Sequence, residues 1–378
     1  MNAPDTALHG QDTTITGRLY IAFELGEKSW KLSLGDGVLG PSRYTLAAGD
    51  KAAVLQAITR AKARCGLAPQ VPVRSCYEAG RDGFWLHRWL TEQGIDNLVV
   101  DSASIEVNRR ARRAKTDRLD GDKLLSMLLR YYAGERRVWA VARVPTQQQE
   151  DERRLHRELG RLRQERTALS NRIRSLLVLH NLRVAHVGGR CWAHWWNDHG
   201  AQLPVGLRAE IERSVARAAL VLTQIRTIEA QQHATVKAGA QPAIALLARL
   251  SGIGVGSAWI LVKELFGWRK FHNRREVAGC LGLTPTPYSS GESQIEQGIS
   301  KAGNKRARAL LVELAWGWLR LQPDSALTQW FNRRFAGSGK RMRRVGIVAL
   351  ARRLAIALWR YLEHGEIPAG AALKPAGT

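Results

Sequence analysis

The segment RLYIAFEL, from Arg18 to Leu25, is the clearest indication of how the N-terminal third of the chain folds. It is rich in strand-forming residues, and a second run, WKLSL from Trp30 to Leu34, follows it and ends at a Gly-Asp-Gly turn. Apolar and β-branched runs that end at turn residues are typical of strands. The two segments therefore predict the first strands of a sheet, and the first strand carries an acid, Glu24.

Beyond these strands, the sequence alternates between strand and helix patterns. Further strands are predicted over 44–48, 71–78 and 97–101, and helices over 52–65, 84–93 and 116–132. The order β-β-β-α-β-α-β-α is that of an RNase H-like fold, in which the first and fourth strands lie side by side at the centre of the sheet. We predict an α/β domain of this class over 18–140, after an N-terminal tail over 1–17.

This order places four carboxylates where they could share metal ions. Glu24, in the first strand, and Glu78, at the end of the fourth, are expected to face one another. Asp117 and Asp120 are three residues apart at the start of a helix, so they point to one face of it, whereas Asp122 falls on another side. Clustered carboxylates are hard oxygen ligands that suit Mg²⁺ or Mn²⁺ and not zinc. Two such ions hold the attacking and leaving oxygens of a phosphodiester, so the acids predict phosphoryl-transfer chemistry.

Each acid also has an ordinary structural interpretation. Asp117 can be a first-turn residue that favours the helix dipole, with Thr116 as its cap. Single Glu residues on strands are usually solvated. Burying an unpaired Glu in an apolar central strand is costly, however, so Glu24 is harder to explain in this way.

The charge of the chain sets the class of partner. Its 378 residues include 58 Lys and Arg against 33 Asp and Glu, a formal net charge of +25 with a pI near 10.8. A basic field of this size usually serves a polyanion, most often nucleic acid. We find no signal peptide, and the most apolar late segment, Val345 to Leu362, is interrupted by arginines. Four cysteines without CxxC spacing indicate a reducing compartment. We predict a cytoplasmic, nucleoid-associated protein that binds double-stranded DNA and no membrane.

Residues 145–240 are predicted to form a helical hairpin or coiled coil. Leucine and isoleucine recur at helical spacing over 155–177, and a second helical run begins at Pro204. This pattern favours a homo-oligomer, a dimer or tetramer, with a solvated helix pair as the alternative. The segment RCWAHWWNDH, over 190–199, has one cysteine and two histidines, whereas a structural zinc site needs four ligands. Its tryptophans are expected to pack at the turn of the hairpin.

A mostly helical domain is predicted over 241–365, followed by a tail over 366–378. The segment LSGIGVGSA has the glycine spacing of a helix-hairpin-helix, in which backbone N–H groups around Gly252 and Gly254 would hold a phosphate. A tight turn between two packed helices is the alternative. A later basic cluster suits a nucleic-acid backbone and consists of Arg333, Arg334, Lys340, Arg341, Arg343 and Arg344.

The stretch from Ala278 to Arg308 contains a candidate nucleophile. A Ser-Ser-Gly turn at 289–291 precedes a predicted basic helix start at Ser300-Lys301, with Lys305 in the following turn. A hydroxyl beside a helix N-terminus and several cations could attack a phosphate that the N–H groups and charges hold. Ser290, directly before the glycine, is the first candidate, and Ser289 is the reserve.

Two sets of motifs resemble a known family. The segments YEAG, from Tyr77 to Gly80, and KTDRLD, from Lys115 to Asp120, look like the second, third and fourth acids of the DEDD transposases of bacterial insertion sequences, of the insertion sequence 110 type. The segments GLTPTPYSSG, from Gly282 to Gly291, and GISKAGN, from Gly298 to Asn304, are similar to the transposase domain of that family. The resemblance covers nearly the whole chain, and the combination of motifs is more specific than any one motif.

The resemblance implies a RuvC-like nuclease domain joined to a C-terminal transposase domain, and a structured bridge RNA that guides the protein by pairing with donor and target DNA. The site residues that it implies are Glu24, Glu78, Asp117 and Asp120 as acids and Ser290 as nucleophile. Two positions depart from the family pattern, because Glu24 stands where Asp is usual and Gly121 where Ala is common. The resulting hypothesis is a DNA transposase or recombinase. A site-specific DNA invertase of the same family, and a nucleic-acid-binding protein with a decayed nuclease site, are the alternatives.

Overall fold

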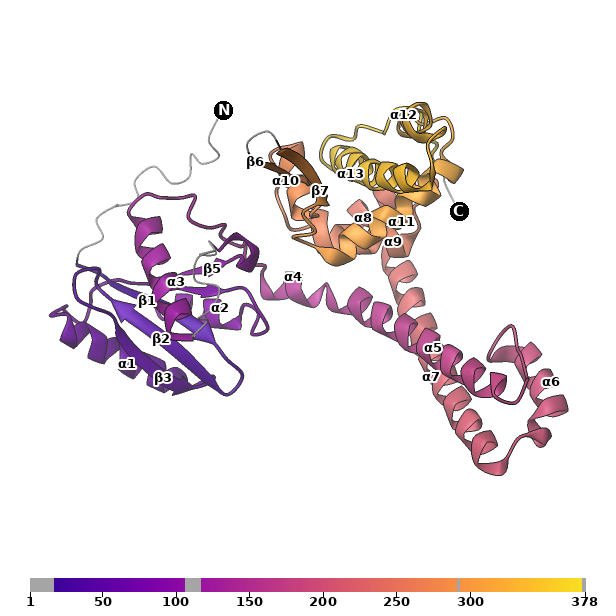
Figure 1. Ribbon diagram of the computed structural model, residues 1–378, viewed down its shortest axis with the longest axis horizontal. Coiled ribbons are helices and arrows are strands. Elements are labelled where there is room, and N and C mark those ends of the chain that lie inside the picture. Colours follow the sequence, from indigo (N-terminus) through magenta and orange to yellow (C-terminus); the bar gives the residue numbers. More distant parts are fainter. Residues whose placement is uncertain (1–16, 106–116, 291–292, 376–378) are drawn as a thin grey trace. The chain divides into compact units, whose positions relative to one another are not determined.

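The computed structural model describes residues 17–105, 117–290 and 293–375, with the backbone alone at 103, 117–120, 287–290 and 293–297 (Figure 1). The chain divides into two compact units, Met1–Pro145 and Thr146–Thr378. Within the described ranges, no helix is both long and apolar enough to cross a membrane.

The N-terminal unit is built on a five-stranded mixed sheet with the strand order β3-β2-β1-β4-β5. Its strands are β1 (Leu19–Leu25), β2 (Ser29–Gly35), β3 (Ser42–Ala47), β4 (Val73–Glu78) and β5 (Asp96–Val100). Strand β2 is antiparallel to β1 and β3, whereas β1, β4 and β5 are parallel to one another. The predicted order of elements and the predicted adjacency of the first and fourth strands are confirmed.

Helices cover both faces of this sheet. Helices α1 (Lys51–Arg64) and α2 (Trp85–Glu92) pack on the face that Leu19, Ile21 and Phe23 of β1 also occupy. Helix α3 (Asp117–Tyr132) packs on the opposite face, with Tyr20 and Ala22. A strand covered on both sides buries every side chain, which explains why β1 is nearly continuous in apolar residues. A short 3₁₀ turn, η2 (Ser102–Ser104), follows β5.

The C-terminal unit begins with α4 (Gln147–Asp151) and two long helices, α5 (Arg154–Val178) and α7 (Val205–Lys237). The start of α5 packs against the end of α7, and Ile173 near the end of α5 packs with Ile211 near the start of α7, so the two helices are antiparallel. Helix α6 (Gly189–His199) and the turn η4 (Gly200–Gln202) connect them. Trp192 of α6 is buried against Ile173 and Ile211, as expected for the tryptophans of this segment.

The remainder of the C-terminal unit is a helical domain with one β-hairpin. Its elements are α8 (Pro242–Ala248), α9 (Val255–Leu261), the π-helical turn η5 (Val262–Phe266), α10 (Arg274–Cys280), β6 (Pro285–Ser290), β7 (Ser293–Ile299), α11 (Lys305–Leu321), α12 (Ala326–Phe335) and α13 (Lys340–His364). The helices share one apolar core, with Leu311 and Trp318 of α11 and Leu354 of α13 nearly or fully buried in it.

The segment after α13 packs onto this domain. The Ala372 N–H donates to the Gln322 side chain at 2.7 Å, and Lys374 Nζ donates to the carbonyls of Ala248 and Ile253 at 2.8 and 2.7 Å. Residues from Glu366 onward were expected to form a tail, but through Lys374 they are tied to the helices around α8 and α11.

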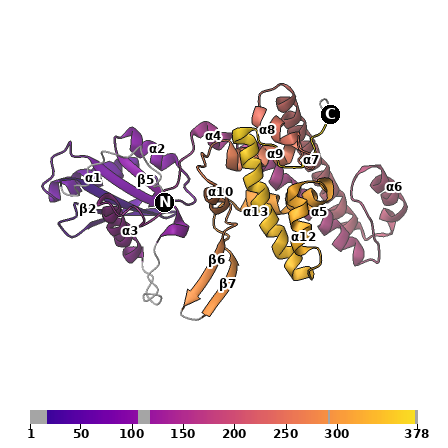
Figure 2. The ribbon, with the colours of Figure 1, turned by 90° about the horizontal axis from the view of Figure 1, so that it is seen from above.

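The helix expected to begin at Ser300-Lys301 begins instead at Lys305. Lys301 and Gly303 have φ angles of +56° and +102°, which a helix does not tolerate, and Asn304 caps α11 by accepting from the Ala307 N–H at 3.0 Å. Ser289 and Ser290, expected to lie in a turn, belong to strand β6 of the hairpin. Figure 2 shows this hairpin extending away from the helices of its unit.

Candidate functional site

Glu24 and Glu78 lie beside each other at the carboxyl ends of two neighbouring parallel strands. The register of β1 and β4 pairs Phe23 with Tyr77, so the two glutamates are the next residue on each strand. Side chains alternate between faces along a strand. Because Ala22 and Cys76 pack on the α3 face, Glu24 and Glu78 belong to that face as well.

Helix α3 brings its first turn to the same end of the sheet. Tyr132, at the end of α3, packs on Tyr20 with ring centroids 6.0 Å apart, and the Leu124 carbonyl accepts from Cys76 Sγ at 4.0 Å, so α3 runs antiparallel to β1 and β4. Glu24 lies about 7 Å along the strand beyond Ala22, which is level with Cys76. A helix covers about 7 Å in four to five residues. The first turn of α3 therefore lies beside the end of the sheet where Glu24 and Glu78 are.

That first turn contains Asp117 and Asp120, whose side chains lie outside the described residues. Of the predicted acids, the structure thus places Glu24 and Glu78 side by side, with Glu24 half-buried and Glu78 exposed. Among the side chains that are described, no group of three or more His, Cys, Asp or Glu residues is arranged so that it could hold a metal ion. Carboxylates at two strand ends and a helix start are nevertheless a donor set that fits a hard divalent cation.

Asp122 holds α3 against the antiparallel edge of the sheet. It accepts from Arg43 Nη2 at 2.6 Å and from Ser33 Oγ at 3.1 Å. Neighbouring Gly121 explains one departure from the family pattern, since a Cβ at this position would lie 2.9 Å from Ser33 Oγ. Asp122 therefore has a structural role, separate from that predicted for Asp117 and Asp120.

Ser290 lies at the tip of the β6–β7 hairpin. It pairs with Ser293, whereas Pro285 and Ile299 pair at the base, six residues away along β7 and so about 20 Å distant. The N-terminus of α11 is at the base. The expectation that this helix supplies N–H groups to a phosphate at Ser290 is therefore wrong for this conformation, because an extended hairpin separates them. The Ser290 side chain and Gly291 lie outside the described residues.

At the base of the hairpin, glycines of the two motifs that resemble the transposase domain allow backbone segments to approach closely. Gly282 has a φ of +64°, and a Cβ there would lie 2.0 Å from the Ala302 carbonyl oxygen. Gly303 has a φ of +102°, and its Cβ would lie 2.2 Å from the Cys280 oxygen. The Lys301 N–H also donates to the Gly282 carbonyl at 3.1 Å. Only glycine allows this close approach, so the motifs secure the junction from which the hairpin extends.

The other predicted nucleic-acid-binding residues are all in the C-terminal unit. The six cations of the basic cluster are exposed and lie at the end of α12 and the start of α13. Gly252, with a φ of +88°, makes the turn between α8 and α9, and the Ser251 N–H in this turn donates to the Ala372 carbonyl at 3.1 Å. This contact fits a tight turn between packed helices, and phosphate binding at Gly252 and Gly254 stays a prediction.

A buried ionic site joins the helical hairpin to the domain that carries the β-hairpin. Glu264, on the π-helical turn η5, is 2% exposed and accepts from Arg157 Nε at 2.7 Å and from His156 Nε2 at 2.8 Å. Asn304 Nδ2, at the cap of α11, donates to it at 3.2 Å. Burial acts to raise the pKa of Glu264, but the hydrogen bonds from His156 and Arg157 hold it well below its ordinary value. Sequence analysis did not identify this site, because its residues are far apart in the chain.

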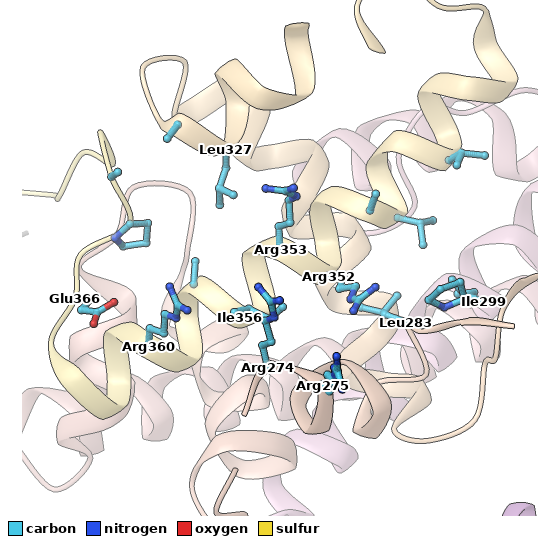
Figure 3. Close-up of a pocket in the computed structure, with 18 of the residues that line it drawn as sticks. Arg274, Arg275, Leu283, Ile299, Leu327, Arg352, Arg353, Ile356, Arg360 and Glu366 are labelled. Atoms are coloured by element: carbon cyan, nitrogen blue, oxygen red, sulfur yellow. The ribbon is translucent and has the colours of Figure 1, made fainter. Parts of the chain in front are cut away.

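Sequence analysis also missed a basic groove along α13. Its cavity of about 1250 Å³ is lined by arginines of α10 and α13 and by the base of the hairpin (Figure 3). The cations are Arg274, Arg275, Lys301, Arg352, Arg353 and Arg360, and one acid, Glu366, is present. The spacing of Arg352, Ile356 and Arg360 at intervals of four was the signal available in the sequence.

Comparison with known proteins matches residues 244–329 to the family described as "Transposase IS116/IS110/IS902 family". This range runs from α8 to α12 and includes the hairpin. The chain is also 40% identical over 378 residues to "Putative transposase y4rJ" of Sinorhizobium fredii, with 95% of each chain covered. The chain belongs to the IS116/IS110/IS902 transposase family.

More distant relatives carry the same designation. "Transposase for insertion sequence element IS1111A" of Coxiella burnetii is 28% identical over 234 residues, covering 58% of this chain and 61% of the relative. "Transposase for insertion sequence element IS1328" of Yersinia enterocolitica is 32% identical over 123 residues, covering 32% and 36%. The protein is therefore an insertion-sequence transposase, an enzyme class that cleaves DNA and transfers its strands.

Proposed function

We propose that this transposase cleaves and rejoins DNA in a metal-dependent reaction whose nucleophile is the Ser290 hydroxyl. The N-terminal unit acts as an RNase H-like domain of the RuvC type, and its acids Glu24, Glu78, Asp117 and Asp120 hold Mg²⁺ or Mn²⁺. A structured bridge RNA selects donor and target DNA. The observation that carries the proposal is the juxtaposition of Glu24 and Glu78 at the end of the sheet to which the first turn of α3 points.

The placement of the acids supports a cation site over a purely structural role. Neighbouring carboxylates repel one another when both are ionised. Without a bound cation, replacing one of the two would therefore make the folded protein more stable. Glu24 continues a strand whose preceding residues are all buried, and Glu78 ends the strand beside it. Oxygen ligands of this kind suit Mg²⁺ or Mn²⁺.

The proposed reaction exchanges one phosphoester bond for another. The Ser290 hydroxyl gives up its proton as its oxygen attacks the phosphorus, the bond from phosphorus to a sugar oxygen of the DNA breaks, and that oxygen takes up a proton and leaves as a hydroxyl. The product is a phosphodiester between Ser290 and the DNA end. Attack by a hydroxyl of the second DNA strand then expels Ser290, so the number of phosphoester bonds is unchanged. The bound divalent ion would stabilise charge on the phosphate oxygens in each step.

The guide RNA follows from the resemblance, and the oligomer follows from the helical pattern over 145–240. A net charge of +25 is large enough to serve more than one nucleic acid. The antiparallel pair α5 and α7 leaves Leu220 60% exposed and Val205 85% exposed, which suits a further helix from a second copy. We propose a dimer or tetramer assembled through this pair.

Strand cleavage by a Glu78→Gln variant tests the proposal. With end-labelled DNA that carries the ends of the element, we expect cleavage in Mg²⁺ to fall by at least about 10–100-fold, the cost of disturbing even the outer partners of a metal site. DNA affinity should be unchanged, because the variant loses ligand charge and almost no volume. Glu92→Gln, at an exposed acid of α2, is the matched control. Cleavage at the wild-type rate by Glu78→Gln would remove the acid cluster from the mechanism.

A further inference from the structure

The groove along α13 is formed by several packed elements of the C-terminal unit. One stripe of α13, with residues at intervals of three or four, forms its floor, and α10 with the base of the hairpin forms one wall. The N-terminal end of α12 and the segment after α13 form the other wall, as Figure 3 shows around Leu327 and Glu366. The opposite stripe of α13, including Leu350 and Leu358, is fully buried in the domain core, so the orientation of the helix is fixed.

The groove contains far more cations than acids, since Glu366 is the one carboxylate among the described residues that line it. Within the described part of the chain, no ion pair with a carboxylate involves Arg274, Arg275, Arg352 or Arg360. Arg353 is held over the Trp330 ring at 4.0 Å, which orients it without neutralising it. Like charges brought together in one groove repel, and a polyanion relieves this repulsion. The charge of the groove therefore specifies an anionic occupant.

The floor of the groove is apolar. Ile356 of α13 lies between Arg352 and Arg360, one turn from each, and Val348 lies one turn before Arg352. Leu283, Ile299 and Leu327 are among the other apolar residues of the lining. The outer surface of a duplex presents phosphates, and its base faces are stacked inside, so a duplex would leave most of this apolar floor without a partner. An unpaired strand presents phosphates on one side and base faces on the other, and it satisfies both parts of the groove.

We propose that this groove holds an unpaired DNA strand, with its phosphates on Arg274, Arg352 and Arg360 and its bases on the apolar floor. A second copy of this chain is disfavoured as the occupant because it too carries a net charge of +25. The inference rests on the proposed function, since strand exchange requires that a cleaved strand be held apart from its complement. The groove begins at the base of the hairpin whose tip carries Ser290, so a strand that leaves the groove and follows the hairpin for about 20 Å reaches the proposed site of cleavage.

The test is DNA binding by a variant with Arg274→Gln, Arg352→Gln and Arg360→Gln together. Affinity for a single-stranded DNA oligonucleotide should fall at least tenfold at physiological salt, and the slope of log K against log salt should become shallower by roughly 2, about 0.7 for each lost phosphate contact. Affinity for a duplex of the same sequence should change little. The matched control removes three exposed arginines from the helical hairpin, Arg161, Arg166 and Arg226, and should not alter the ratio of the two affinities.

A second measurement does not depend on the variant. Single-stranded DNA substituted with bromouracil, crosslinked by light to the unaltered protein, should attach to peptides that contain residues 345–360 or 298–301. The proposal would be overturned if the triple variant lost affinity equally for single-stranded and duplex DNA, or lost affinity only for single-stranded RNA of the same sequence. Crosslinks found only outside the groove would also overturn it. Binding is measured without cleavage, so a transposase that failed the Glu78→Gln test could still pass this one, and the reverse.

Discussion

At the scale of single residues, Glu24 is the acid whose identity matters most. It stands where the family usually has Asp, and it lies in a strand packed on both faces, with Phe23 before it fully buried. The longer side chain moves its carboxylate outward by one methylene, and Mg²⁺ demands near-ideal octahedral geometry.

Glu24→Asp is therefore expected to keep or to raise the rate of strand cleavage, measured in Mg²⁺ and again in Mn²⁺. Leu25→Val, at the next position of β1, is a control for small changes in side-chain volume at this strand end. An inactive Glu24→Asp protein that still folds would show that the site has been rebuilt around glutamate.

His156 is the residue from which we expect a pH dependence of stability. Burial lowers its pKa, against the opposing effect of its hydrogen bond to Glu264. The unfolded chain, with a histidine pKa of about 6.5, then binds the proton more readily than the folded protein. The contribution of neutral His156 is complete above that pKa and is lost as the pH falls below it.

In urea unfolding between about pH 7.5 and 5, the range around the histidine pKa, the free energy of unfolding should fall more steeply in wild type than in His156→Gln. Glutamine keeps a donor to Glu264 and does not titrate. His87, whose pKa burial also lowers, is present in both proteins and cancels in the difference. Parallel pH curves would remove His156 as the cause.

At the scale of elements, the sequence predicted the N-terminal unit well because each of its strands and helices has a clear local pattern. The β6–β7 hairpin was missed for a physical reason. Pro285 and Pro287 interrupt the strand pattern of β6, and the pairing of β6 with β7 has an irregularity between them. Helix α11 begins at Lys305 and not at Ser300 because Lys301 and Gly303 have positive φ angles. These angles depend on contacts with Gly282 and Cys280 that no local sequence pattern reveals.

The junction of α5, η5 and α11 around Glu264 should be important for stability. Glu264→Gln removes the charge that Arg157 and His156 share and leaves polar groups poorly satisfied in a site that is 2% exposed. We expect the free energy of unfolding to fall by about 2 kcal/mol or more, measured by urea unfolding at pH 7.5. The control Glu229→Gln breaks the exposed 2.6 Å pair with Arg163 and should cost under about 1 kcal/mol. Equal effects would show that the Glu264 junction adds nothing beyond a surface pair.

At the scale of the whole molecule, the proposed acids and the proposed nucleophile belong to different compact units. Glu24 and Glu78 lie in the unit that ends at Pro145, and Ser290 lies in the unit that begins at Thr146. Sequence order and resemblance predict both sets of residues, and their catalytic roles stay predictions. Neither predicted the groove or the Glu264 junction. The interval of four from Arg352 to Arg360 marks one stripe of α13, but the walls of the groove and the partners of Glu264 come from packing between elements far apart in sequence, which leaves no periodic signal.

The central claim is that Ser290 forms the covalent bond to DNA and that the acids of the other unit enable it. The most direct measurement is to trap the protein–DNA adduct, digest it, and identify by mass spectrometry the residue that carries the phosphate. We predict that the phosphate is on Ser290, that Ser290→Ala forms no adduct, that Ser289→Ala forms a reduced amount, and that Asp117→Asn binds DNA without forming an adduct. A phosphate on any other residue, or an adduct that persists in Ser290→Ala, would contradict the account.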